Sequence, residues 1–252
     1  MTPPDRRSDA PTGMPSDGAT GRGNAASSGD VGAMFDRIAR VYDQLNLVIS
    51  GFQEPRWRRR LVAATRLGPG MAAIDVATGT GAVARDLGRV VGPGGSVLGI
   101  DISSEMVARA AAHTGTPAHV RYELGNALAL PVADGAFDAA TIAFGMRNLP
   151  DYAAGFAEMA RVVGPGGVVA CLEIARPRTL LGRLGRLWFE RVVPRIGGLA
   201  GQGDAYRYLV ASVKTYPPPS AIAAIMRDVG LVEVRWRPMT FGMVTLHTGR
   251  RG

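Results

Sequence analysis

Short apolar runs alternate with amphipathic segments along most of the chain. This alternation is typical of a sheet whose parallel strands are joined by helices. Strands are expected at Ala72–Ala77, Ser96–Asp101, Val120–Leu124, Phe137–Phe144 and Val168–Ile174. Two final strands, at about 231–238 and 242–248, are separated by only a few residues, so we expect them to pair antiparallel.

Helical periodicity fills the segments between these strands. Apolar residues at intervals of three and four predict a helix that begins near Ala33 and a second helix around Trp57. Further helices are expected at about 82–91, 103–114, 152–163, 204–215 and 220–229. The predicted fold class is therefore α/β, a doubly wound and mostly parallel sheet with extra N-terminal helices and a helical insertion after the fifth strand.

Residues 1–30 are rich in Gly, Ser, Pro, Ala and Asp and contain almost no large apolar side chain. Such a segment buries too little surface to offset the entropy of ordering, so we expect a disordered tail. Residues 31–252 are expected to form a single domain, because their apolar content is enough for one sizeable core. No apolar run is long enough for a transmembrane helix.

Composition narrows the class of protein. The formal net charge of +8 indicates attraction to anionic surfaces, either nucleic acid or lipid. Cys171 is the only cysteine, which fits a reducing cytoplasm. The three histidines are not spaced like metal ligands, so we expect no metal site.

The first strand runs into a glycine turn, Gly79-Thr80-Gly81, which a helix follows. Ligands of doubly wound sheets bind at the carboxyl ends of such strands. The segment from Gly79 to Ala84 also fits the dinucleotide-binding pattern, and strand-to-helix turns often carry glycine without any ligand.

Asp75 favours one of these interpretations. It precedes the turn within the strand, so its carboxylate would face the turn, where it repels a pyrophosphate and attracts a cationic ligand. S-adenosylmethionine carries a sulfonium and an amino group, and its nucleoside has no phosphates. We therefore expect S-adenosylmethionine as cofactor, with Asp75, Gly79, Thr80 and Gly81 at its site.

Polar residues at two further strand ends complete the expected cofactor site. Asp101 ends the second strand, where a carboxylate can accept hydrogen bonds from both ribose hydroxyls. Asn126 and Ala127 follow the third strand, and an amide that both donates and accepts suits the adenine edge. Each residue also has an ordinary structural role open to it, as a cap or a turn former.

Several motifs in this order resemble those of the menaquinone and ubiquinone biosynthesis C-methyltransferases, a class I S-adenosylmethionine-dependent family, from about Met34 to Gly249. The specific pieces are Tyr42-Asp43-Gln44-Leu45-Asn46, Asp75 with the glycine turn, Thr141–Asn148, Arg161–Gly167, Ala205–Leu209 and Leu246–Gly249. Phe144-Gly145-Met146-Arg147-Asn148 and Tyr206-Arg207-Tyr208-Leu209 are much narrower signatures than the glycine turn.

The resemblance implies a Rossmann-like class I methyltransferase fold and C-methylation of a reduced, lipophilic quinol. Between the two quinones, the arginine-heavy composition, typical of a GC-rich genome, favours demethylmenaquinol over the ubiquinone precursor. Ala143, at the end of the fourth strand, joins the expected cofactor residues, although many members carry a hydroxyl there. Arg147 and Asn148 are the expected catalytic residues, with Tyr206 and His247 as alternative proton acceptors and Glu173 as a further one. An Arg-Asn pair with a purely structural role stays open.

A basic segment between Arg176 and Arg195 interleaves arginines with Leu, Trp and Phe. This pattern suits a membrane interface, and equally a solvated face over an ordinary core helix. With a polyprenyl substrate, we expect a cytoplasmic protein that transiently contacts the inner face of the membrane. The oligomeric state stays open, a homodimer included.

Two other functions remain at this stage. A class I methyltransferase acting on nucleic acid, or on another small molecule, would suit the basic charge, although no RNA-binding module is appended. A non-catalytic protein that binds S-adenosylmethionine within a quinone-synthesis assembly is the second. We favour the quinol methyltransferase, with no nucleic-acid partner.

Overall fold

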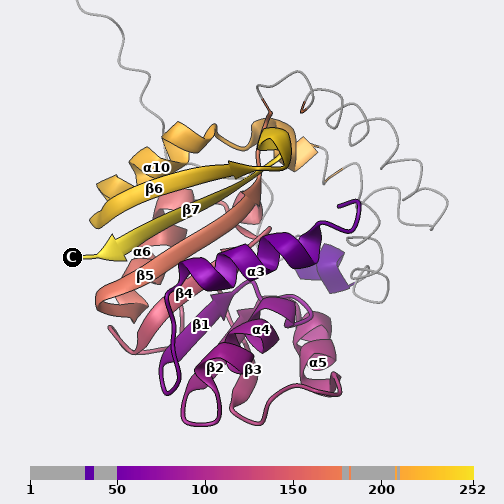
Figure 1. The fold of residues 1–252 in the computed structure, drawn as a ribbon. Helices are drawn as coiled ribbons and strands as arrows, with labels where there is room; N and C mark the ends of the chain where they lie inside the picture. The colour runs from indigo at the N-terminus through magenta and orange to yellow at the C-terminus, as the bar shows by residue number, and fades with distance from the viewer. Residues whose placement is uncertain (1–31, 37–49, 178–181, 183–207, 209–210) are drawn as a thin grey trace, which may run out of the picture.

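The computed structural model describes residues 32–36, 50–177, 182, 208 and 211–252, and all structural statements refer to these (Figure 1). They form a seven-stranded sheet with the strand order β3-β2-β1-β4-β5-β7-β6. Its strands are β1 (Ala72–Val76), β2 (Ser96–Asp101), β3 (Val120–Leu124), β4 (Phe137–Ala143), β5 (Val163–Ile174), β6 (Leu231–Met239) and β7 (Val244–Arg251). The pairs among β1 to β5 are parallel, whereas β7 pairs antiparallel with both β5 and β6.

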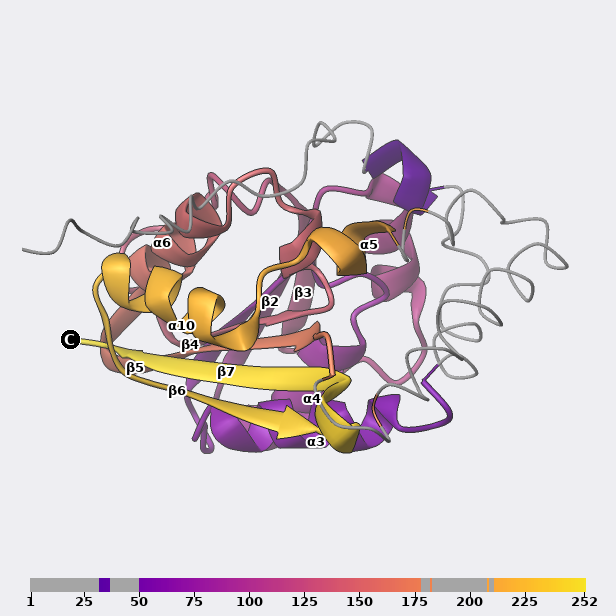
Figure 2. The same ribbon diagram turned by 90° about the horizontal axis from the view of Figure 1, so that it is seen from above.

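Helices cover both faces of this sheet (Figure 2). One face packs against α3 (Glu54–Ala64) and α4 (Ala82–Val91), and the other against α6 (Tyr152–Val162) and α10 (Pro219–Asp228). The helix α5 (Ser104–Ala112) packs on β2 and β3. The predicted α/β fold, with its mostly parallel sheet and its antiparallel C-terminal pair, is confirmed.

Each face of the sheet supports its own hydrophobic core. Phe156 and Met159 of α6 and Met226 of α10 are fully buried on one side, and Leu61 of α3 and Leu87 of α4 on the other. A strand buried on both faces is apolar at successive positions, as β5 is from Val168 to Leu172. This pattern is the reason why the central strands were readable from the sequence.

The predicted strand ends need corrections at the two central strands. β1 stops at Val76 and β4 at Ala143, because the next residues, Ala77 and Phe144, have left-handed backbone angles with φ of 52° and 57°. Such angles are uncommon for residues with a side chain and end a strand. The apolar character of the two residues had suggested that the strands continue.

The last strands differ more from the prediction. β5 begins at Val163, before the expected turn at 164–167, because Val163 already pairs with Phe137 across an irregular register. β7 runs from Val244 to Arg251 rather than from 242 to 248, since a short 3-10 turn, η2 (Thr240–Gly242), precedes it. Of the helix expected to begin near Ala33, residues 32–36 are helical, and of the helix expected at about 204–215, residues 211–215 are helical. The remainder of both lies outside the described residues, like residues 1–30 and most of the basic segment.

Among the described helices, none combines the length and the apolar character that crossing a bilayer requires.

Candidate active site

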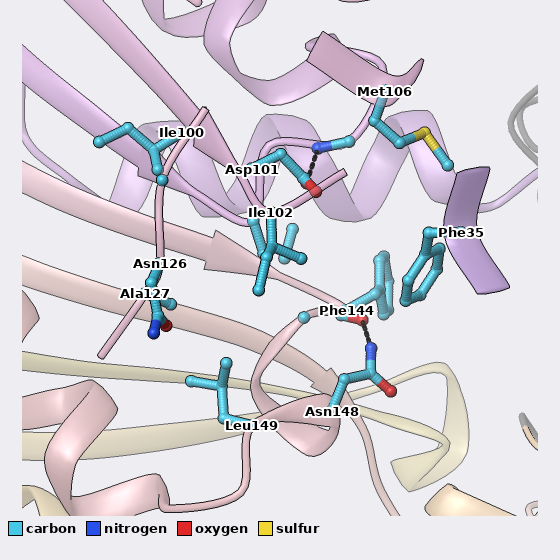
Figure 3. Close-up of a pocket in the computed structure, with 15 residues that line it drawn as sticks. Phe35, Ile100, Asp101, Ile102, Met106, Asn126, Ala127, Phe144, Asn148 and Leu149 are labelled. Carbon is cyan, nitrogen blue, oxygen red and sulfur yellow. Dashed lines mark hydrogen bonds between the residues drawn. The ribbon is translucent and has the colours of Figure 1, made fainter. Parts of the chain in front are cut away.

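A pocket opens at the carboxyl ends of β1, β2 and β4 (Figure 3). β1 is the strand at which the chain reverses its direction across the sheet, with β2 on one side and β4 on the other, and ligands of open α/β sheets bind at this point. About 670 Å³ of space not filled by protein atoms lies there, including the open solvent at its mouth. Its lining residues are Phe35, Ala77, Gly79, Ile100, Asp101, Ile102, Met106, Gly125, Asn126, Ala127, Ala143, Phe144, Gly145, Asn148 and Leu149.

The glycine turn rests on a buried carboxylate. Asp75 is 1% exposed, and its two oxygens accept hydrogen bonds from the hydroxyls of Thr78 at 2.6 Å and Thr141 at 2.7 Å. Thr141 belongs to β4, so Asp75 links β1, β4 and the turn that follows β1. The sequence had suggested that Asp75 contacts the ligand. The structure instead places Asp75 beneath the turn and outside the lining of the pocket.

The turn continues into α4 through Gly81, whose φ is 80°. A side chain at this position would collide with the ring of Tyr122 as well as strain the backbone. Thr80 and Gly81 do not line the pocket, whereas Gly79 does.

Asp101 connects the turn to the end of β2. One carboxylate oxygen accepts the backbone N–H of Gly79 at 2.7 Å (Figure 3). The other accepts the backbone N–H of Ser103 at 2.9 Å. Each oxygen of an ionised carboxylate can accept more than one hydrogen bond, so Asp101 can accept further donors from a ligand in the pocket that it lines. Burial raises the pKa of Asp101, and these backbone N–H donors oppose that effect.

The neighbouring walls of the pocket are mainly apolar. Ile102 and Met106 follow Asp101, and Phe35 approaches them from residues 32–36 (Figure 3). The contact of this N-terminal piece is fixed by Asp36, whose carboxylate accepts the hydroxyl of Ser103 at 2.5 Å at the start of α5. Asn126 and Ala127 lie at the opposite wall, where the Asn126 side-chain oxygen already accepts the N–H of Leu128 at 3.0 Å.

The two left-handed residues at the ends of β1 and β4 both line the pocket. Strained backbone of this kind persists only where the surroundings hold it, and it gathers at functional sites. Gly145 makes the close approach possible, because a side chain there would lie 2.6 Å from the Cβ of Ala77. The segment after β4 is thereby held against the end of β1.

Asn148, in the 3-10 helix η1 (Met146–Asn148), lines the pocket. Its side-chain N–H₂ is 3.5 Å from the carbonyl oxygen of Phe144, and its buried Oδ1 has no hydrogen-bond partner within the described part of the chain. Buried polar atoms without a partner are uncommon, which makes this oxygen a candidate acceptor for a bound molecule.

Arg147 is directed away from the lining and into a buried ion pair. Its guanidinium donates to Glu173 Oε1 at 2.7 Å and to the carbonyl of Phe144, and its backbone N–H donates to Glu173 Oε2 at 3.2 Å. The side chains of Arg147 and Glu173 are 6% and 1% exposed. Glu173, expected only as a fallback proton acceptor, is therefore the residue that fixes Arg147.

Tyr206 and His247, the two alternative proton acceptors, differ in what the structure shows of them. Tyr206 lies outside the described residues. His247 is 1% exposed in β7, its Nε2 is 3.0 Å from the carbonyl oxygen of Pro219, and burial lowers its pKa to about 4. The structure does not bring His247 to the pocket, so it stays a neutral core residue at pH 7.

Sequence reasoning thus found Gly79, Asp101, Asn126, Ala127, Ala143 and Asn148 in the pocket lining. It missed the apolar walls, above all Phe35, Ile102 and Met106. For Ile102 and Met106 a signal existed, because they follow Asp101 at the start of a helix. For Phe35 none existed, since its contact depends on the folded chain.

The chain matches the sequence profile described as the ubiE/COQ5 methyltransferase family over residues 23–251. The chain belongs to this family. A demethylmenaquinone methyltransferase from Thermus thermophilus is 43% identical over 223 residues, which cover 86% of this chain and 100% of the relative. The ubiquinone/menaquinone biosynthesis C-methyltransferase UbiE from Geobacter sulfurreducens is 41% identical and covers 87% of both chains.

Solved structures agree on the fold of this ubiE/COQ5 methyltransferase family member. A SAM-dependent methyltransferase from Thermotoga maritima, described as a possible histamine N-methyltransferase, superposes with a TM-score of 0.64 at 17% identity. The alignment covers 88% of this chain and 99% of that one. The protein is an S-adenosylmethionine-dependent methyltransferase.

The pocket fits this cofactor. Asp101 offers carboxylate lone pairs for ribose hydroxyls, and Ile102, Met106 and Phe144 offer apolar surface for a base. Asn148 Oδ1, a buried acceptor without a partner among the described residues, suits a polar or cationic group at the other end. A carboxylate and a neutral amide in the lining are a better match for a phosphate-free nucleoside than for a pyrophosphate.

We predict that the buried carboxylate of Asp75 makes the free energy of unfolding depend on pH. Burial raises its pKa from 3.8 to about 6, so its contribution to stability is fully present below about pH 4 and is lost as the pH rises through about 6. Asp75→Asn removes this titration at nearly unchanged shape. Between about pH 4 and pH 7, the free energy of unfolding of the unmodified protein should fall relative to that of the variant by about 3 kcal/mol, at about 1.4 kcal/mol per pKa unit. Urea unfolding at several pH values measures this difference, and a constant difference would contradict it.

Asp101 predicts a loss of cofactor affinity. Asp101→Ala should weaken S-adenosylmethionine binding by about 1.5–3 kcal/mol, which is typical for hydrogen bonds to a charged group. Calorimetry measures the affinity, and thermal unfolding shows whether the turn at Gly79 survives. Glu105→Ala is the control, because it removes a half-exposed carboxylate from α5 outside the pocket. Unchanged affinity in folded Asp101→Ala would remove Asp101 from the site.

Proposed function

We propose that this chain transfers the methyl group of S-adenosylmethionine to a ring carbon of a reduced polyprenyl quinone precursor, converting demethylmenaquinol to menaquinol. The main support for this proposal is the match to the family, together with the position of the family-specific motif Phe144-Gly145-Met146-Arg147-Asn148 in the fold. The segment from Phe144 to Asn148 borders the pocket, where an acceptor substrate must meet the methyl donor.

The chemistry requires an electron-rich ring. The cofactor supplies an electrophilic methyl group on its sulfonium. The quinol ring carbon forms the new C–C bond as the S–CH₃ bond breaks, and that carbon then loses its proton. A hydroxyl next to the carbon, whose pKa in a free phenol is about 10, enriches the carbon further when it is deprotonated. The oxidised quinone lacks this electron density.

The residues beside the pocket suit positioning and charge stabilisation, which such a transfer needs from the protein. Asn148 lines the pocket, and its buried Oδ1 has no hydrogen-bond partner among the described residues, so its amide is a candidate to orient a quinol hydroxyl. Arg147 acts on the reaction through position. Its guanidinium is held by Glu173 and donates to the carbonyl of Phe144, so the pair fixes the segment that carries Asn148 beside the substrate.

Other acceptors and other functions have less support. His247 lies under α10, bonded to Pro219, and Glu173 is committed to Arg147. The ubiquinone precursor is the second candidate substrate, since one relative is named for both quinones. Methylation of nucleic acid and a non-catalytic role are not favoured, because the curated relatives that match most of the chain are named quinone C-methyltransferases.

A polyprenyl substrate places the reaction at a lipid surface. We include in the proposal a cytoplasmic enzyme that contacts the inner face of the membrane transiently. The basic segment between Arg176 and Arg195, expected from the sequence to make this contact, lies mostly outside the described residues. The net charge of +8 favours attraction to anionic lipids, which weakens as salt rises.

The substrate prediction separates the redox forms. Purified protein with methyl-labelled S-adenosylmethionine should methylate demethylmenaquinone kept reduced by dithionite, and the same quinone without reductant should give at most a trace. Mass spectrometry of the lipid extract identifies the product. Label that appears in added RNA but not in the quinol would contradict the proposal, and so would equal transfer to both redox forms.

Replacing Arg147 is expected to lower turnover, and this effect must be distinguished from a loss of stability. Arg147→Ala should lower kcat about 10²–10³-fold at nearly unchanged S-adenosylmethionine affinity, because the segment that carries Asn148 loses the ion pair that positions it. It also leaves Glu173 buried without its partner, which costs about 3–5 kcal/mol of stability.

The double variant Arg147→Met with Glu173→Gln removes both charges. It should recover the stability that Arg147→Ala loses, without restoring turnover. Recovery of kcat to within about threefold in the double variant would reduce the pair to a structural role. Arg89→Ala is the control for removing one partner of an ion pair, because the Arg89–Asp86 pair lies on the exposed end of α4.

A further inference from the structure

A second depression, separate from the cofactor pocket, runs between α3 and the strands β6 and β7. Figure 1 shows β7 and β6 continuing the sheet beyond α3, with no described helix in front of them on that face. About 1310 Å³ of space not filled by protein atoms lies there, including its wide mouth. We call it the basic groove, because its lining contains Arg60, Arg66, Arg235, Arg237 and Arg250.

The charges of the basic groove are not balanced. Glu233 is the only acidic residue in its lining. None of the five arginines takes part in an ion pair within the described part of the chain, and Arg250 donates a hydrogen bond to the carbonyl oxygen of Gly166 at 3.0 Å. Elsewhere in the described chain, arginines such as Arg58 and Arg161 pair with carboxylates. The groove is therefore a concentrated, uncompensated positive field.

Two exposed aromatic side chains lie on β6 and in the turn that follows it. Trp236 lies between Arg235 and Arg237 in β6 and is 43% exposed, but its side chain alternates to the α10 face, where its cross-strand partner His247 bonds Pro219. Phe241 occupies the turn between β6 and β7 and is 60% exposed. Three successive residues of this turn, Thr240 to Gly242, have positive φ angles, which are unfavourable for Thr240 and Phe241 and gather at functional sites.

The aromatic turn is connected to the cofactor pocket. The indole N–H of Trp57, in α3, donates to the hydroxyl of Thr240 at 2.8 Å. The ring of Trp57 lies 6.1 Å from that of Phe144, centroid to centroid, and Phe144 lines the pocket. The end of the basic groove that carries Phe241 is thus the end nearest to the reacting centre.

We propose that the basic groove and the turn with Phe241 form the surface by which the protein docks on an anionic phospholipid bilayer. Arginines at a bilayer surface bind lipid phosphates, and exposed aromatic side chains insert among the headgroups. The proposal rests on the proposed function, since a polyprenyl substrate requires an enzyme that works at a lipid surface. Arginines that only protect the edge strand β6 from pairing with another chain would not require a Phe held out beside them.

The test compares two variants in vesicle co-sedimentation, with phosphatidylglycerol/phosphatidylcholine vesicles and with phosphatidylcholine alone. Arg235→Gln with Arg237→Gln should weaken binding to the anionic vesicles about 30-fold at low salt, at about 1 kcal/mol per charge, and much less at high salt. Phe241→Ser should weaken binding about tenfold at both salt concentrations, because burial of an apolar ring is not screened. Neutral vesicles should bind poorly.

Matched controls lie at the other side of the molecule. Arg89→Gln with Arg121→Gln removes the same charge from α4 and from the opposite edge strand β3. This variant should bind the anionic vesicles within about twofold of the unmodified protein, because salt screens charges that lie far from the lipid surface. Val90→Ser, on α4, is the control for loss of one exposed apolar side chain. All variants should methylate a short-chain, water-soluble demethylmenaquinol at the unmodified rate, which shows that they are folded.

The outcomes separate this proposal from the proposed function. If no quinol is methylated but vesicle binding follows the groove variants, the proposed function fails and the docking surface stands. The docking surface is overturned if the groove variants bind like the unmodified protein, or if only Arg183→Glu with Arg186→Glu abolishes binding. It is also overturned if neutral vesicles bind as well as anionic ones, or if the variants lose affinity for RNA or an acidic protein but not for vesicles.

Discussion

The carboxylate of Asp75 is the interaction on which the active site depends. It sits in the middle of the sheet, 1% exposed, and accepts the hydroxyls of Thr78 and Thr141. These two bonds fix the glycine turn above β1 and attach it to β4. A buried carboxylate is costly, and the cost shows as a pKa raised to about 6. A hydrophobic residue would serve the core better, so we attribute the carboxylate to the shape of the turn.

The turn then determines the cofactor pocket. With the turn fixed, the N–H of Gly79 points at Asp101, and the carboxylate of Asp101 is held at the end of β2. Ala77, after β1, and Phe144, after β4, both have left-handed backbone angles. Gly145 has no side chain, which allows the end of β4 to lie against the end of β1. Asn148 reaches the pocket from this segment, while Arg147 enters the interior and meets Glu173.

The sequence predicted what depends on local pattern. Buried strands are apolar at successive positions, so their order and the polar residues at their ends, such as Asp101 and Asn126, could be located without a structure. What it did not predict depends on contacts between distant segments. Glu173 follows Arg147 by a whole helix and strand, and Phe35 reaches the pocket through Asp36 and Ser103. The early start of β5 at Val163 likewise follows from pairing with Phe137, although the glycines after Val163 indicate a turn.

The central claim is that the pocket at the end of β1 holds S-adenosylmethionine, with its methyl group toward the segment from Phe144 to Asn148. A crystal structure with S-adenosylhomocysteine bound tests it most directly. We predict both ribose hydroxyls within hydrogen-bond distance of Asp101, the adenine between Ile102 and the Asn126–Ala127 wall, and the sulfur facing Asn148. A ligand bound outside this pocket, or a ribose that does not contact Asp101, would contradict the account.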